Sequence, residues 1–148
     1  MITLTLKKLE HAHDLPLPEY ATEGASGLDL RAAIDKNLTL QPGERLLLPT
    51  GIIVQIPFGY EGQVRTRSGL SLKEGLMVLN SPGTIDSDYR GEIQVLMINM
   101  GQTSVTIHRG MRIAQLVIAP VAHVRISPVS VVEETVRGVG GFGSTGVL

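Results

Sequence analysis

The chain has 148 residues, of which 43% are hydrophobic and 18% charged, so it is long enough for one domain and too apolar for a disordered protein. It carries a formal net charge of −1 and no cysteine, which excludes disulfides, zinc–thiolate sites and a general attraction to nucleic acid or membrane. The chain shows no apolar run of membrane-spanning length and no signal-peptide core, so we expect a cytoplasmic protein.

Short strand-like runs separated by turn residues fill most of the chain. Only five residues are aromatic, so the core has to consist of Val, Ile and Leu, which favours β structure. Runs of this length bounded by Gly, Pro and Asp are typical of an antiparallel sandwich or barrel. In chain order, we expect strands at residues 2–6, 27–31, 38–40, 44–48, 51–56, 63–67, 92–99, 103–107 and 113–118, with a weaker candidate at 123–126.

One short helix is expected over residues 69–74. Ser71 and Glu74 have the spacing of a capping box, and Gly75 is placed to end the helix. No window supports a helix of ten residues, which excludes Rossmann, P-loop and helix-bundle folds. The sequence therefore predicts an all-β fold with a single short helix.

The C-terminal segment RGVGGFGSTG, residues 137–146, has five glycines and no periodicity. Such a composition cannot pack a core, so we expect one domain over residues 1–136 and a flexible segment over 137–148. The segment has two interpretations. It is either a disordered tail or a phosphate cradle made of glycine N–H groups, Arg137 and hydroxyls, with Phe142 free to stack on a base.

The segment NSPGTIDSDYRG, residues 80–91, combines a tight turn with two carboxylates. Asp86 and Asp88 are two positions apart, which would place them on one face of an extended segment. We expect Asp86 to be half-buried near a strand end, where it could act as a general base for water. The alternative is a solvated hairpin loop, in which Asp and Gly are common.

The segment RTRSGLSLKEG, residues 65–75, places Ser68 and Gly69 where a strand gives way to the short helix. Free N–H groups and the helix dipole would bind phosphate there, with Arg67 adjacent. The alternative is an ordinary serine cap.

Two polar residues interrupt apolar runs. Asp29 lies in GLDLRAA and, if buried, needs a cation or a hydrated metal; the alternative is an exposed face of an edge strand. Gln115 lies in the run 113–118, where a buried amide is either a structural bridge or a ligand contact.

Five segments in order resemble the motifs of the trimeric dUTP diphosphatases: GASGLDLRA, RTRSGLSLKEG, NSPGTIDSDYRGE, RGMRIAQLVI and RGVGGFGSTG. They run from Gly24 to Gly146. Thr66 stands where the family often has Pro, and Ser71 where it often has Ala; neither replaces a side chain that the family uses for chemistry.

The resemblance implies a jelly-roll-like β barrel that forms a homotrimer with active sites at subunit interfaces. It implies hydrolysis of dUTP to dUMP and pyrophosphate by water attack on the α-phosphorus, with Mg²⁺ chelated by the triphosphate. This activity would limit uracil incorporation into DNA and supply dUMP for thymidylate synthesis.

The resemblance also implies a role for each site residue. Asp86 would activate water, Asn80 would line the uracil pocket, and Tyr89 would exclude a 2′-hydroxyl. Asp29 would reach Mg²⁺ through water. The phosphates would be held by Arg67, Ser68, Gly69 and Gln115, and a neighbouring subunit would close the site with Arg137, Phe142, Gly143, Ser144 and Thr145.

Two alternatives remain at this point: a dCTP deaminase-like enzyme of the same fold, and a nucleotide-binding trimer without turnover. The complete RGVGGFGSTG and IDSDYRG segments favour the diphosphatase.

Overall fold

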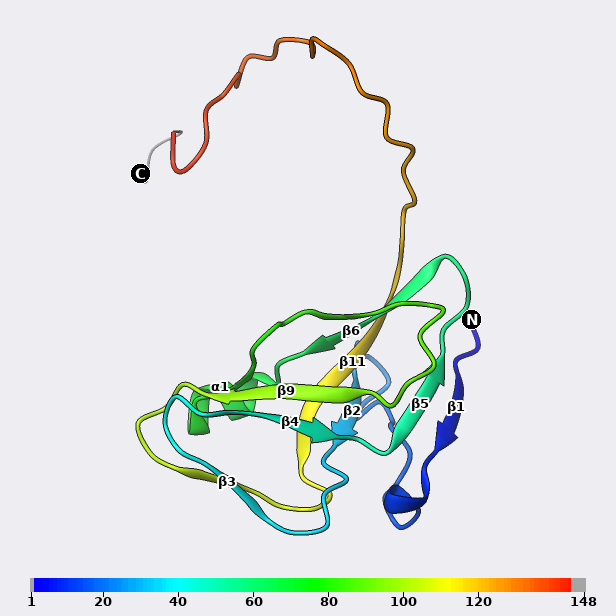
Figure 1. Cartoon of the computed structure of the whole chain (residues 1–148), viewed down its shortest axis with the longest axis vertical. Helices are drawn as coiled ribbons and strands as arrows, with labels where there is room; N and C mark the ends of the chain where they lie inside the picture. The colour runs from blue at the N-terminus through cyan, green and yellow to red at the C-terminus, as the bar shows by residue number, and fades with distance from the viewer. Residues whose placement is uncertain (1, 145–148) are drawn as a thin grey trace.

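The computed structural model describes residues 2–144, which form a β-rich body and a long C-terminal arm (Figure 1). The elements in chain order are β1 (Thr5–Lys8), the 3₁₀ helix η1 (Glu10–Ala12), β2 (Leu28–Arg31), β3 (Leu38–Leu40), β4 (Arg45–Pro49), β5 (Ile52–Gln55), β6 (Tyr60–Arg65), α1 (Ser68–Glu74), β7 (Leu76–Val78), β8 (Gly83–Ile85), β9 (Gln94–Asn99), β10 (Val105–Ile107) and β11 (Arg112–Pro120).

The strands pair antiparallel into small sheets around one core. The largest sheet has the order β2-β11-β6-β8, a second has the order β4-β9-β7, and β1-β5 and β10-β3 form two-stranded sheets. The buried core cluster consists of aliphatic side chains and Met97, and Leu30, Leu48 and Leu116 are among its most buried members. The expectation of a core built without aromatics is therefore confirmed within the described residues.

Most strand predictions agree with the structure, and the exceptions have local causes. Each of the nine firm predictions overlaps an observed strand. The weaker candidate at 123–126 is wrong, because the chain has left the body there and pairs with no strand. Strands β7 and β8 were missed because each has only three residues and they flank a turn rich in polar residues and Gly.

The short helix is confirmed, but its start differs from the prediction. Gly75 ends α1 with a positive φ of 70°, and its N–H donates to the Ser71 carbonyl at 3.1 Å. The capping box is wrong, because Arg67 occupies the N-cap and Ser71 lies inside the helix. The Ser71 hydroxyl instead donates to the Leu76 carbonyl at 3.2 Å.

The arm begins where β11 ends. The Val121 N–H still donates to the Gly59 carbonyl at 2.9 Å, and residues 122–139 are then all exposed. Figure 1 shows the arm arcing away from the body. Between residues 2 and 144, no helix is long and apolar enough to cross a membrane.

Candidate active site

A buried carboxylate holds two arginines at one edge of the largest sheet. Asp29 on β2 accepts a hydrogen bond from Arg67 Nε at its Oδ1 and from Arg112 Nη1 at its Oδ2, both at 3.0 Å. The Asp29 side chain is only 8% exposed. Although β2 is an edge strand, the exposed-face alternative for Asp29 is wrong, and a cation partner is what the structure provides.

Strand register explains why these residues meet. Strand β11 pairs with both β2 and β6, so Gln115 lies opposite Asp29 on one side and Arg65 on the other. Gln115 is half-buried, and no hydrogen bond of its side chain is found among the described residues. Its amide is therefore available to a ligand beside the two arginines.

The start of α1 lies next to this cluster. Arg67 is the N-cap residue, and no side chain caps the helix, so the ordinary serine cap is wrong. Ser68 and Gly69 are exposed in the first turn, where backbone N–H groups have no partner within the helix. Nothing lies within 4 Å of the place where a Cβ on Gly69 would be, which leaves room for an anion.

Asn80 belongs to the turn between β7 and β8, which is tied to the end of β6. The Val78 N–H donates to the Thr66 hydroxyl at 2.9 Å, and the Thr66 N–H donates to the Ser81 hydroxyl at 3.3 Å. Asn80 Nδ2 would lie 3.1 Å from a Cβ on Gly83, so its side chain covers that glycine. Thr66 thus anchors the turn that carries Asn80.

The loop after β8 differs from the prediction in two respects. The Tyr89 N–H donates to the Asp86 carbonyl at 3.1 Å, closing a turn, so Asp86 and Asp88 do not share a face of an extended segment. Asp86 is exposed rather than half-buried, because the turn projects beyond the end of β8. The Tyr89 hydroxyl donates to the Glu92 carbonyl at 3.1 Å, and its ring covers Gly91.

The register of β6 separates this loop from the arginine cluster. Ile85 pairs with Gly62, so Asp86 lies near the start of β6, whereas Arg67 follows its end. At about 3.3 Å per residue, the two ends are roughly 16 Å apart. One chain therefore brings Asp29, Arg67, Ser68, Gly69 and Gln115 together, but not with Asp86 and Tyr89.

The Gly-rich end of the arm forms local turns. Arg137 Nε donates to the Gly140 carbonyl at 2.9 Å, and the Ser144 N–H donates to the Gly141 carbonyl at 3.1 Å. Phe142 is fully exposed and has a positive φ of 49°, followed by Gly143 at 85°. Thr145 lies outside the described residues. Up to residue 144, the end of the arm lies apart from the body (Figure 1).

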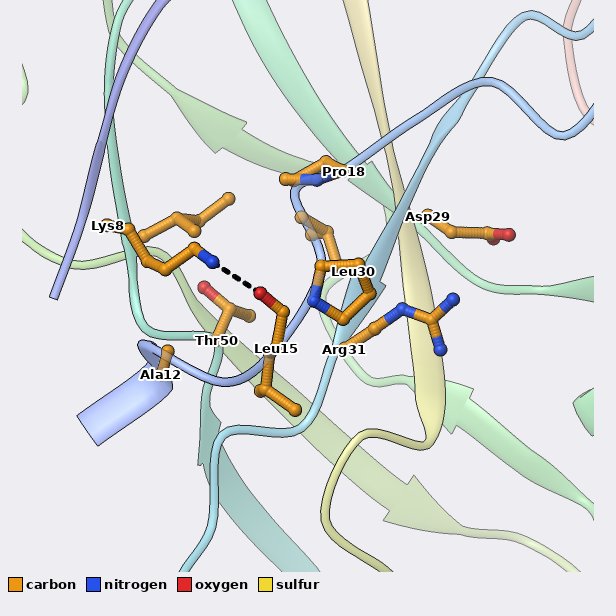
Figure 2. Close-up of a pocket in the computed structure, with 10 residues that line it drawn as sticks. Lys8, Ala12, Leu15, Pro18, Asp29, Leu30, Arg31 and Thr50 are labelled. Atoms are coloured by element: carbon orange, nitrogen blue, oxygen red, sulfur yellow. Dashed lines mark hydrogen bonds between the residues drawn. The ribbon is translucent and has the colours of Figure 1, made fainter. Parts of the chain in front are cut away.

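A small pocket lies on the other side of β2, where the Lys8 amine donates to the Leu15 carbonyl (Figure 2). Its volume of about 10 Å³ suits a single water molecule. The Asp29 carboxylate points away from it (Figure 2). This pocket cannot hold a nucleotide, so the surface formed by the arginine cluster is the better candidate.

The side chains available as metal ligands determine which kind of metal site is possible. Among residues 2–144, no group of three or more His, Asp or Glu side chains is placed to hold a metal ion. Asp29 offers one carboxylate, and both of its oxygens accept from guanidinium groups. These residues therefore form no cage of their own for a metal ion, and fit only an ion held mainly by a bound ligand.

Together, the fold and this cluster define an all-β protein with a candidate site for an anionic ligand. A family model described as dUTPase matches residues 13–146. Deoxyuridine 5′-triphosphate nucleotidohydrolase from Aquifex aeolicus is 63% identical over 145 residues, covering 98% of this chain and 97% of the relative. The Rhizobium etli protein of the same name is 59% identical over 147 residues, covering 98% and 94%. The chain belongs to the dUTPase family.

Solved structures agree with this assignment. The dUTPase of Staphylococcus bacteriophage 80alpha with dUPNHPP superposes with a TM-score of 0.89 at 29% identity, covering 99% of this chain and all of that chain. A mutant dUTPase from phage phi11 of S. aureus, described as coordinating a structural Mg(II) ion, has a TM-score of 0.79 at 25% identity, covering 90% and 100%. The all-β fold with one short helix is thereby confirmed.

Sequence reasoning missed Arg112. It lies three positions before Gln115 in RGMRIAQLVI, and its spacing from Asp29 in the sequence is too large for any local pattern to reveal the contact. Strict alternation would place Arg112 and Gln115 on opposite faces of β11, but the register shifts between Arg112 and Ala114, which no sequence pattern indicated.

Proposed function

We propose that the chain hydrolyses dUTP to dUMP and pyrophosphate by attack of water on the α-phosphorus. Family membership and full-length relatives named for this activity support the proposal. The observation that carries it is the pair of arginines fixed by Asp29 beside the open start of α1. In its cell, such an activity limits uracil incorporation into DNA and supplies dUMP for thymidylate synthesis.

The triphosphate would bind at the arginine cluster. Arg67 donates its Nε to Asp29 and its Nη1 to the Arg112 carbonyl at 3.3 Å, which leaves Nη2 to contact phosphate oxygens. The N–H groups of Ser68 and Gly69 add donors in fixed positions, and Gln115 adds its amide. Catalysis of phosphoryl transfer depends mainly on positioning the phosphates and stabilising their charge.

The nucleoside would bind at the other end of β6. Asn80 would line the uracil pocket, and the Tyr89 ring would leave no room for a 2′-hydroxyl. Asp86 is exposed on its turn and free to orient and deprotonate the attacking water, because it forms no ion pair within the described residues.

Mg²⁺ chelated by the triphosphate would neutralise phosphate charge and orient the leaving pyrophosphate. Asp29 would accept hydrogen bonds from its water shell. The arginines beside Asp29 hold that carboxylate in place before substrate arrives.

We propose further that the enzyme is a homotrimer with active sites between subunits. A general base has to reach its water directly, yet Asp86 and Arg67 of one chain lie near opposite ends of β6, which are about 16 Å apart. A second copy of the chain would place its own Asp86 beside the Arg67 of the first. The body also has an apolar groove of about 610 Å³, bordered by Leu4, Leu28 and Ile118, that a neighbouring arm can cover.

In this assembly, residues 1–136 are the domain with its connecting arm, and residues 137–148 are a lid. Arg137 would reach the phosphates of a neighbouring site, and Phe142 would stack over the uracil. The hydroxyls of Ser144 and Thr145 and the N–H of Gly143 would hold the phosphates, excluding water from the closed site.

A pyrophosphate-release assay with dUTP, dCTP, dTTP and UTP in parallel tests the proposal. We expect rapid release from dUTP alone. Consumption of dCTP would favour the deaminase-like alternative, and binding of dUTP without release would favour a non-catalytic trimer.

A further inference from the structure

An aromatic stack marks the point where the arm leaves the body. Two positions beyond Val121, the His123 ring lies parallel to the Phe58 ring, with centroids 5.4 Å apart and an interplanar angle of 4°. Offset parallel rings at this separation attract one another. The stack is thus placed to set the direction in which the arm starts.

Phe58, the partner of His123 in the body, lies in a tight turn. Phe58 is in the turn between β5 and β6, where the Tyr60 N–H donates to the Pro57 carbonyl at 3.2 Å and Gly59 has a φ of 86°. Phe58 is 85% exposed, so its ring adds little to the core. A large apolar ring fixed in solvent at a turn has little structural purpose except its contact with His123.

The stack also borders the loop that carries the proposed base. Phe58 and His123 line a cavity of about 450 Å³ together with Glu61, Asp86 and Asp88. The arm therefore starts beside the nucleoside end of the proposed site.

We propose that Phe58 and His123 are positioning residues, whose stack aims the arm so that its lid reaches the active site more often. The inference rests on the proposed lid function. Arg137 follows His123 by 14 positions, and a chain of that length reaches at most about 50 Å and sweeps a large volume. Fixing its first direction raises the local concentration of the lid at the site.

Kinetics of single variants test this role. We expect Phe58→Ala to lower kcat/KM for dUTP about two- to tenfold, the factor that corresponds to an aromatic pair. Phe58→Tyr and His123→Phe keep two stacked rings and should retain wild-type values. Leu47→Ala, which truncates an exposed apolar side chain on β4, is the matched control and should have no effect.

A variant that ends at Val136 and lacks the lid tests whether Phe58 acts by positioning the arm or only by supporting the structure. Its core is intact, because the buried hydrophobic residues all lie between Ala12 and Leu116. Because this shortened chain has no lid, adding Phe58→Ala to it should change its residual activity less than twofold. An equal loss in the full and shortened chains would overturn the proposal.

Arm mobility gives a readout that does not depend on the lid. The chain has no cysteine, so Ser130→Cys accepts a single nitroxide label in the arm. We expect Phe58→Ala to sharpen the electron paramagnetic resonance spectrum of the labelled full chain without nucleotide, and Phe58→Tyr to leave it unchanged. An unchanged spectrum in Phe58→Ala would overturn the aiming role. Full activity of the chain ending at Val136 would instead refute the lid, with the spectrum still deciding whether the stack aims the arm.

Discussion

The body and the arm both contain many apolar residues, but only the body buries them. Leu30, Leu48 and Leu116 are almost fully inaccessible, whereas Val124, Ile126 and Val131 are each more than 80% exposed. Hydrogen bonding differs in the same way. Strand pairs connect distant parts of the body, while the backbone bonds of residues 135–144 each span three positions.

This difference indicates that the two regions obtain their order from different sources. The body gains enough from its own burial to offset the loss of chain entropy on folding, which is about 1–2 kcal/mol per residue. The arm gains almost nothing from its own chain, so its ordering has to come from a neighbouring subunit or a bound nucleotide. Changes in the arm should therefore lower activity without unfolding the protein, whereas changes in the body can affect both.

Deleting residues 137–148 tests the arm and has the largest expected effect. The protein should remain folded, because the described part of this segment, residues 137–144, contributes nothing to the core. Activity should fall by about 10³-fold, the lower end for an arginine supplied in trans. Circular dichroism and pyrophosphate release measure the two quantities. Arg125→Ala, in the same arm, is the control and should stay active; an unfolded deletion variant would show that the segment is structural.

Asp86→Asn tests the body's contribution to chemistry. We expect turnover to fall ~10²–10⁴-fold, because asparagine orients water but cannot accept its proton. Binding of a non-hydrolysable dUTP analogue, measured by calorimetry, should persist. Asp88→Asn, in the same turn, should leave turnover close to wild type. Near-wild-type turnover in Asp86→Asn would refute the assignment of the base.

Tyr89→Ala tests whether the body selects the sugar. The ratio of kcat/KM for dUTP over UTP should fall about tenfold or more, since the ring no longer occupies the space of a 2′-hydroxyl. Tyr89→Phe loses only the hydrogen bond to the Glu92 carbonyl and should keep the ratio. A lower stability with an unchanged ratio in Tyr89→Ala would make Tyr89 a packing residue.

The smallest expected effect concerns the ion pair between Asp14 and Arg109, in which no proposed site residue takes part. A side-chain hydrogen bond from Arg109 lowers the pKa of Asp14 from 3.8 to about 2. The pair therefore stabilises the body fully above pH 4 and progressively less as the pH falls from 4 to 2. Thermal midpoints of wild type and Asp14→Asn should differ slightly at pH 6 and converge at pH 2, with activity at pH 7 unchanged. A difference that persists at pH 2 would contradict this linkage.

Local patterns were enough to predict most of the body. Short apolar runs bounded by turn residues located β4, β9 and β11, because run length and chain reversal depend on neighbouring residues. Gly75 ended the helix as predicted, because glycine adopts a left-handed conformation without strain. Residues 123–126 have the pattern of a strand, but a strand needs a partner, and residues 2–144 provide none for them.

The chemistry-bearing residues were found by type and motif, while their arrangement depended on the tertiary structure. Asp29, Arg67 and Arg112 are 38 and 45 positions apart in succession and meet only because β11 pairs with both β2 and β6. The same register places Asp86 at the opposite end of β6, a separation that no sequence pattern contains. Sequence by itself determined where most of the elements lie, since these depend largely on short-range sterics and turn residues. Strand register decided which side chains meet, because it is set by contacts across the whole fold.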